Sequence, residues 1–273
     1  EQSAKLMVSD AKGQRVLVDP AAVAGDKLMT MGAYALSPDG RTVAVHLSSG
    51  GSEVGKIHFF DVATGKEAYP ALPNMWGEGA VTFLPGGLIA YNQMPAEAVD
   101  GDISNGTASF IRPLAGGPQT LVFGKGAGGA DVSPEEFPIV FAPPASPFVV
   151  GVGAGARADQ NFFLAPRAGL LAGKPQWVRL AGLADRVGTI ALRGNQVYMV
   201  TSRTNSARDL VVQGVDARGK AVGPVRTVMA GTPDLIVNDA VATRDGIYVV
   251  ASSDGVMRLF HTPGGKVAPR EIT

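Results

Sequence analysis

Short runs of apolar residues alternate with clusters of turn residues along the whole chain, and one unit recurs about every 50 residues. Each unit opens with two apolar runs around a turn rich in Pro, Gly or Asp, as in residues 32–49 (GAYALSPDGRTVAVHLSS). A second hairpin follows, as in residues 56–71 (KIHFFDVATGKEAYPA). Two hairpins in succession predict a four-stranded antiparallel blade, and a lone blade must stack on neighbours to cover its faces.

The repeats predict an all-β fold, a β-propeller of about five and a half blades in a single domain, 1–273. Residues 5–20 match only the second hairpin of a unit and form a partial first blade. Whole blades are expected at about 32–72, 79–124, 137–181, 187–230 and 237–273. Helix signals are weak, with room for one turn within residues 21–28. A β-sandwich or an irregular all-β domain is the alternative.

The N-terminal part resembles the propeller of the prolyl oligopeptidase family of serine peptidases. Residues 16–20 (VLVDP) and 37–67 (SPDGRTVAVHLSSGGSEVGKIHFFDVATGKE) carry the match. In order, they supply a Leu/Phe-Asp-Pro segment, a Ser-Pro-Asp-Gly hairpin, a Gly-Gly-Ser-Asp/Glu turn and an Asp-x-x-Thr-Gly-Lys/Glu hairpin. Downstream the likeness is looser: residues 176–178 (QWV) and 198–211 (YMVTSRTNSARDLV) echo family segments, although the second lacks a Pro and has different spacing.

The resemblance implies a seven-bladed propeller placed before an α/β-hydrolase domain. This chain would then hold the second half of blade one and blades two to six, without the catalytic domain. No Gly-x-Ser-x-Gly elbow occurs in it, and the three histidines lie in strand-like runs or beside a turn. We therefore expect the segment itself to carry no catalytic residues, and the parent protein to be a serine oligopeptidase.

The amino-acid composition argues against several classes of partner and cofactor. Basic and acidic residues are equal in number, 24 each, and no basic run occurs, which argues against a nucleic-acid partner. Cysteine is absent, metal-ligand spacings are missing, and no apolar run reaches the length of a membrane span. No cofactor or metal is therefore expected. The Ala- and Gly-rich composition and the secreted relatives of this family favour a bacterial periplasmic or secreted location over the cytoplasm.

Candidate functional positions lie where the innermost strand of each blade begins, because these strand ends surround the central channel of a propeller. The resemblance implies that this end of the channel faces the hydrolase site. The candidates for the substrate channel are Trp76, Glu78, Glu136, Arg186 and Asp239. Glu78 and Glu136 stand where the resemblance implies apolar residues, and as a partly desolvated pair they would favour a cationic group on a peptide. The alternative is that both are ordinary solvated residues.

Three functions follow from these observations. The first is a non-catalytic propeller that gates access of short peptides to a hydrolase domain on the same parent chain. The second is a stand-alone propeller that binds a protein or peptide as a scaffold. The third is a propeller enzyme such as a glycosidase or lactonase, for which Glu78 and Glu136 are the carboxylate pair to test. A native reading frame that continues into a Gly-x-Ser-x-Gly segment would favour the first over the second.

Overall fold

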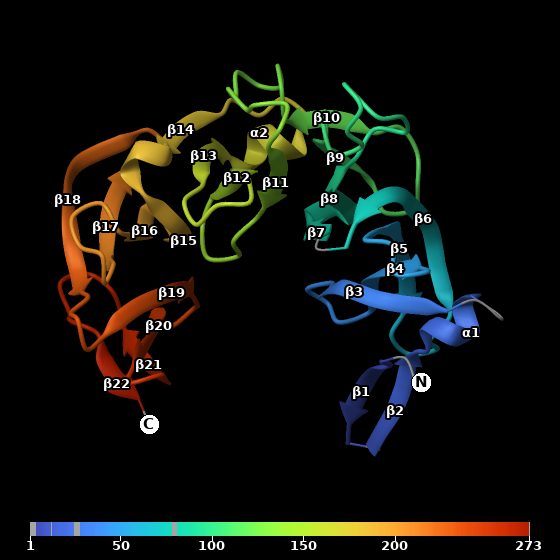
Figure 1. Ribbon diagram of the computed structural model, residues 1–273, viewed down its shortest axis with the longest axis horizontal. Helices are drawn as coiled ribbons and strands as arrows, with labels where there is room; N and C mark the ends of the chain where they lie inside the picture. The colour runs from blue at the N-terminus through green and yellow to red at the C-terminus, as the bar shows by residue number, and fades with distance from the viewer. Residues whose placement is uncertain (1–3, 12, 25–27, 78–80, 273) are drawn as a thin grey trace. The chain divides into compact units, whose positions relative to one another are not determined.

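The computed structural model describes residues 4–11, 13–24, 28–77 and 81–272. Among these residues the strands form one two-stranded hairpin and five four-stranded antiparallel sheets (Figure 1). This confirms the predicted fold class, an all-β propeller of about five and a half blades. The strands, sheet by sheet, are β1 (Leu6–Asp10) and β2 (Gly13–Val18); β3 (Met29–Leu36), β4 (Thr42–Ser49), β5 (Val54–Asp61) and β6 (Glu67–Trp76); β7 (Val81–Leu84), β8 (Leu88–Gln93), β9 (Ala108–Pro113) and β10 (Thr120–Phe123); β11 (Phe137–Phe141), β12 (Phe148–Ala154), β13 (Asn161–Pro166) and β14 (Val178–Ala181); β15 (Val187–Arg193), β16 (Gln196–Thr201), β17 (Asp209–Val215) and β18 (Ala221–Ala230); β19 (Ile236–Ala242), β20 (Ile247–Ser253), β21 (Val256–Thr262) and β22 (Arg270–Ile272).

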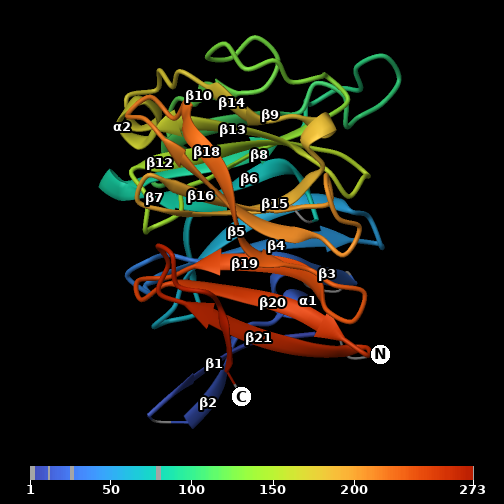
Figure 2. The same cartoon turned by 90° about the vertical axis from the view of Figure 1, so that its left-hand side faces the viewer.

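Every four-stranded sheet is a meander, in which each strand pairs with the next one in the chain. Figure 2 shows this arrangement for β19, β20 and β21. The second strands β4 and β12 are buried over nearly their whole length, and β12 reads as a continuous apolar run. The first strand β3 alternates between half-buried and exposed residues. A strand that is covered on both faces is buried at nearly every position, whereas a strand that is covered on one face is buried only at every second position.

The Ser-Pro-Asp-Gly turn between β3 and β4 satisfies its polar groups locally. The Ser37 hydroxyl donates to Asp39 Oδ1 at 2.6 Å and accepts the backbone N–H of Thr42 at 2.9 Å. Gly40 adopts a left-handed φ of 72°, which costs glycine little. The turn therefore satisfies its own polar groups and sets the register between β3 and β4.

Two short helices interrupt the strands. Helix α1 (Pro20–Ala24) is the single turn that the sequence allowed. Helix α2 (Arg167–Leu171) was not predicted and lies in the connection between β13 and β14, where paired extended segments were expected. Its sequence, Arg-Ala-Gly-Leu-Leu, has no β-branched residue, and Arg, Ala and Leu are good helix formers that offset the glycine. No described helix is long and apolar enough to cross a membrane.

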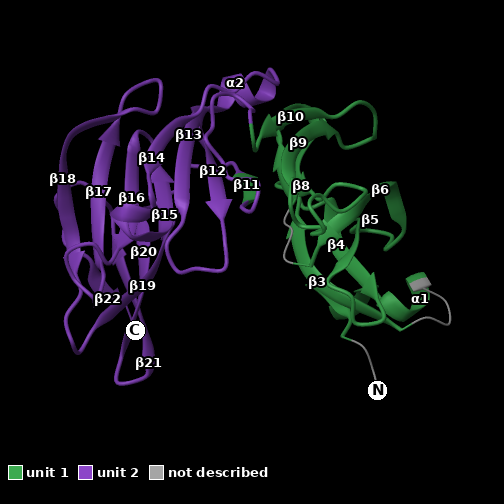
Figure 3. Ribbon diagram, turned by 45° about the horizontal axis from the view of Figure 1, so that its top comes forward, with its two compact units in different colours: residues 1–125, 137–140 green, residues 126–136, 141–273 purple. Residues whose placement is uncertain are grey.

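The chain divides into two compact units, residues 1–125 with 137–140 and residues 126–136 with 141–273 (Figure 3). In unit 1 one core joins the sheet β3–β6 to β7–β10 around the fully buried Phe59 and Tyr91. A second core packs Leu17 and Val18 of the β1–β2 hairpin on Val45 and its neighbours. In unit 2 one core lies between the sheets β15–β18 and β19–β22. Burial of such aromatic and branched side chains stabilises each sheet pair by roughly 1.5–3 kcal/mol per side chain.

Candidate functional site

The meander topology brings distant parts of unit 2 to the same end of its sheets. The second strand of a meander returns to the end where the first strand began, so the connection from strand two to strand three lies beside the start of strand one. In unit 2 this end carries the β12–β13 connection, the β16–β17 connection and the first residues of β15 and β19. Polar loop residues gather there for that reason.

At this end unit 2 contains a cavity of about 860 Å³. Two of the residues proposed from the sequence, Arg186 and Asp239, line it together. Polar and charged side chains from the neighbouring strands and loops also line it, among them Asp159, Thr189, Arg203, Asn205, Arg208 and Asn238. The sequence pattern did not mark Asp159, Arg203 and Arg208 as site residues. The signal for the last two was present in residues 198–211, which were noted only for their family likeness.

Arg186 enters the cavity from the residue that directly precedes β15. It ends the one-turn helix Leu183–Asp185 and adopts a left-handed φ of 51°. Its side chain is mostly exposed, and its Nε lies 3.9 Å from Asp159 Oδ2, a long ion pair. Water screens such a pair, so the guanidinium remains available to a ligand.

Asp239 enters from β19, where the pairing with β20 shifts at a bulge between Val237 and Asp239. Its Oδ1 accepts the Thr189 hydroxyl at 2.9 Å and the backbone N–H of Ala240 at 2.8 Å. The bulge re-aims the side chain, and Thr189 from the neighbouring sheet fixes it. The carboxylate is half-buried, and its Oδ2 has no protein donor among the described residues.

The β16–β17 connection is held in shape by one buried carboxylate. Asp209, only 8% exposed, accepts hydrogen bonds from the Asn205 amide at 3.0 Å and the Gly231 N–H at 3.1 Å through Oδ1. Its Oδ2 accepts the Thr204 hydroxyl at 3.1 Å. This network fixes the loop that presents Arg203 and Arg208, because each donor comes from a different part of the connection or of the sheet end.

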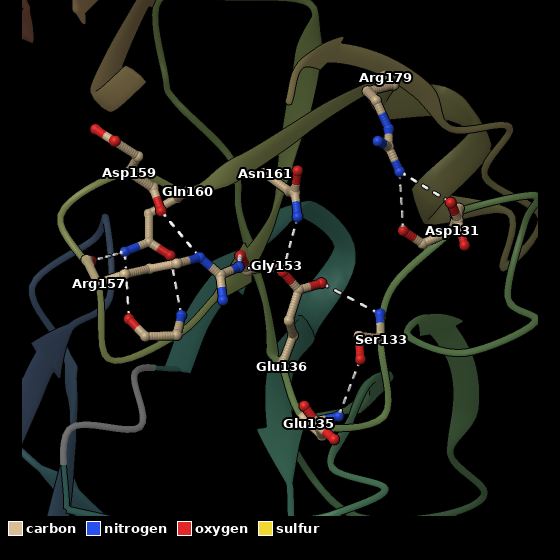
Figure 4. Close-up of polar contacts among 11 residues, drawn as sticks. Asp131, Ser133, Glu135, Glu136, Gly153, Arg157, Asp159, Gln160, Asn161 and Arg179 are labelled. Atoms are coloured by element: carbon tan, nitrogen blue, oxygen red, sulfur yellow. Dashed lines mark hydrogen bonds and ion pairs between the residues drawn. The ribbon is translucent and has the colours of Figure 1, made fainter. Parts of the chain in front are cut away.

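Glu136 stands outside the cavity and organises one of its walls. The carboxylate is 6% exposed and forms an ion pair with Arg157, while the Asn161 amide donates to it at 2.7 Å (Figure 4). Its other oxygen accepts the Ser133 N–H at 3.2 Å. The chain itself thus neutralises this charge, and the bonds tie the β12–β13 connection, which supplies Asp159, to the segment before β11.

The remaining two candidates are Trp76 and Glu78. Trp76 is the last residue of β6, half-buried, with its ring tilted on Phe137 at a centroid distance of 5.8 Å. Glu78 lies outside the described residues. The roles of Trp76 in a substrate channel and of Glu78 in a carboxylate pair with Glu136 therefore stay predictions.

The three histidines contact groups other than hydroxyls. His46 is buried, its Nε2 lies 3.1 Å from the Met75 carbonyl, and burial lowers its pKa. His58 Nδ1 contacts Glu67 at 2.6 Å, and His261 Nε2 lies 3.6 Å from Asp245. Within the described ranges, no serine or threonine hydroxyl is bonded to a histidine, and no cluster of three His, Asp or Glu residues is placed to hold a metal ion.

Comparison with known proteins agrees with this architecture. Residues 2–104 match the family described as the prolyl oligopeptidase N-terminal β-propeller domain. This match and the fold confirm the resemblance noted from the sequence. No curated protein sequence matches the chain.

Solved structures extend the likeness to the whole fold. A prolyl endopeptidase, from a study of inter-domain dynamics in catalysis and specificity, superposes with a TM-score of 0.79 at 16% identity over 100% of this chain and 39% of its own. Oligopeptidase B from Leishmania major gives 0.68 at 12% identity over 92% of this chain and 34% of its own. Prolyl oligopeptidase B from Galerina marginata, bound to a 35-residue hydrolysis and macrocyclization substrate, has a TM-score of 0.73 at 12% identity. The likeness covers 96% of this chain and 38% of that enzyme's chain. The chain thus spans well under half the length of these relatives and has the fold of their propeller.

Proposed function

We propose that this chain is the non-catalytic propeller of a serine peptidase of the prolyl oligopeptidase type, and that it limits access to a hydrolase site on a separate domain to short peptides. The likeness of the complete chain to 39% of a prolyl endopeptidase, at a TM-score of 0.79, carries the proposal. The larger part of that enzyme lies beyond the region that this chain resembles.

The histidine environments support a site located elsewhere. Acyl transfer by a serine needs a hydroxyl within hydrogen-bond reach of a base. Among the described residues the histidines instead contact a carbonyl or a carboxylate. A propeller of this kind contributes selection by size and by the polar groups at its loop-bearing end, while another domain supplies the bond chemistry.

Relatives of the same fold support selection of peptides. For the prolyl endopeptidase, inter-domain dynamics is assigned a role in catalysis and specificity. The Galerina marginata enzyme has been captured with a 35-residue peptide substrate. In this chain the loop-bearing end of unit 2 offers charged side chains of both signs, which suits the polar backbone of a peptide better than an apolar ligand.

The decisive experiment uses the protein encoded by the natural reading frame and a variant without residues 4–272. Both are titrated with a fluorophosphonate probe that counts competent serine nucleophiles, and both are assayed on a short fluorogenic peptide and on an unfolded protein substrate. We expect the intact protein to cleave only the short peptide, and the deletion variant to gain activity on the long substrate per titrated site.

An equal ratio of the two activities in both proteins would refute gating. A natural protein that does not react with the probe and lacks a Gly-x-Ser-x-Gly segment would refute the peptidase assignment and leave the propeller as a binding scaffold. If the deletion variant does not react with the probe, a second variant takes its place. In that variant, pairs of cysteines introduced at neighbouring blade edges lock the propeller as disulfides, and reduction releases it. These 273 residues contain no cysteine, so the introduced pairs would be the only cysteines within this segment.

A further inference from the structure

The cavity of unit 2 contains arginines whose guanidinium groups have distant partners, or none, among the described residues. Arg203 Nη1 pairs with Asp185 at 3.2 Å, and Arg186 reaches Asp159 only at 3.9 Å. Arg208 also lines the cavity and is half-buried. Within the part of the chain that the structure describes, no ion pair or hydrogen bond engages its guanidinium. A half-buried cation without a partner is poised to bind an anionic group.

The backbone holds both available arginines in an unusual conformation. Arg186 has a φ of 51° and Arg208 a φ of 63°, and both line the same cavity. The other non-glycine residues with positive φ in the described ranges are Asn or Asp, which tolerate this region far better than arginine does. Strained conformations persist where the surroundings enforce them, and here the Asp209 network fixes the loop that ends in Arg208.

The charges of the cavity wall select the kind of ligand. Arg186, Arg203 and Arg208 stand against Asp159 and Asp239, a formal charge of +1 for the lining side chains. A phosphate or a polyanion would place a second negative charge beside the two aspartates, which repels it. A single carboxylate matches the available charge, and Oδ2 of Asp239 can accept an N–H from the same ligand.

We propose that this cavity binds the free C-terminal end of a peptide, with Arg208 and Arg186 donating to its α-carboxylate and Asp239 accepting from a backbone N–H. The proposal deepens the peptide-selecting function above, and it names the recognised group: a terminal carboxylate, the mark of a short or already cleaved peptide. Asn238, whose amide donates to Ser252 at 3.0 Å, and Thr189 complete the polar wall around it.

The test measures binding directly, so that it does not depend on gating or on turnover. The protein of the natural reading frame is first treated with a fluorophosphonate, and calorimetry then measures its affinity for N-acetyl-trialanine as the free acid and as the C-terminal amide. We expect the acid to bind at least about tenfold more tightly than the amide. Arg208→Gln should remove that preference by weakening the binding of the acid far more than that of the amide.

Arg218→Gln is the matched control, because Arg218 is an exposed arginine in the turn between β17 and β18 and outside the cavity. It should keep the full preference for the acid. Arg208→Lys, which keeps the charge and loses the planar fork, should retain part of it. A cooperative thermal transition like that of the unmodified protein shows that each variant is folded.

Equal affinities for acid and amide would overturn the proposal, and so would an Arg208→Gln variant that still prefers the acid. Inorganic phosphate that competes more strongly than the peptide acid would also overturn it, in favour of a phosphate site. Because none of these readouts involves cleavage, a gating defect in the deletion experiment and a loss of acid preference here are separate results.

Discussion

The Glu136 network gives the sharpest prediction for stability. Glu136→Ala removes a carboxylate that is 6% exposed and that accepts from Arg157, the Asn161 amide and the Ser133 N–H. The change leaves the Asn161 amide, itself 9% exposed, without this acceptor. It also frees the β12–β13 connection from the segment before β11.

The magnitude follows from how each partner can compensate. Hydrogen bonds to a charged group contribute about 1.5–3 kcal/mol each, and breaking a fully buried ion pair costs about 3–5 kcal/mol. Arg157 is 35% exposed, so water can rehydrate it, and it keeps its bond to the Asp159 carbonyl at 3.1 Å. The cost of losing the ion pair is therefore smaller than for a fully buried pair. We expect Glu136→Ala to lower the free energy of unfolding by about 2–4 kcal/mol.

Chemical denaturation followed by circular dichroism measures this loss, with Glu135→Ala as the matched control. Glu135 is the exposed neighbour, and its side chain makes no hydrogen bond among the described residues, so its removal should change stability by no more than about 0.5 kcal/mol. Hydrogen exchange should also speed up at Gly155 and Arg157, whose loop loses its anchor. The reasoning is refuted if Glu136→Ala and Glu135→Ala destabilise the protein equally.

Two further predictions concern unit 1. Burial lowers the pKa of His46 below its ordinary value of 6.5, so the unfolded chain takes up that proton first and the free energy of unfolding should fall as the pH drops below 6.5. Between pH 7.5 and pH 5 the free energy of unfolding, measured by denaturation, should fall less in His46→Gln than in the unmodified protein, and equal losses would contradict this. Carboxylates such as Asp39, whose pKa is lowered from 3.8, do not titrate in that window. Gly55→Ala would bring a Cβ to 2.2 Å from the Leu47 carbonyl oxygen, so we expect it to lower the melting temperature sharply, by the equivalent of about 2 kcal/mol or more. Gly182→Ala, whose Cβ would meet nothing closer than 3.7 Å, is the control, and a similar effect of both changes would show that the β4–β5 approach is not tight.

The local pattern of residues was enough to predict the sheets. The hairpin around Ser37 and Asp39 satisfies its polar groups within a few residues, so the turn and the register of β3 on β4 follow from sequence alone. The same holds for the turn at Asp61, whose carboxylate accepts the Thr64 N–H at 2.8 Å. Repetition of such hairpins, each with one face to cover, implies stacked blades and therefore a propeller.

The sequence also placed Arg186 and Asp239 where innermost strands begin, and in the structure both line one cavity. It did not reveal the rest of the cavity. Arg208 and Asp159 lie in loops whose direction depends on contacts made elsewhere, with Asp209 holding one loop and Glu136 the other. Helix α2 was missed for a related reason, since a five-residue helix within the connection from β13 to β14 is too short to show a helical period.

Short-range hydrogen bonding and the two-residue period of strands are properties of neighbouring residues, and the sequence by itself determined what depends on them: the hairpins, the blades and the fold. The partners of Glu136, the free guanidinium of Arg208 and the bulge that aims Asp239 depend on which distant loops the packed sheets bring together. Only the tertiary structure decided these, because a side chain's long-range partner is set by sheet packing and twist that no local pattern encodes.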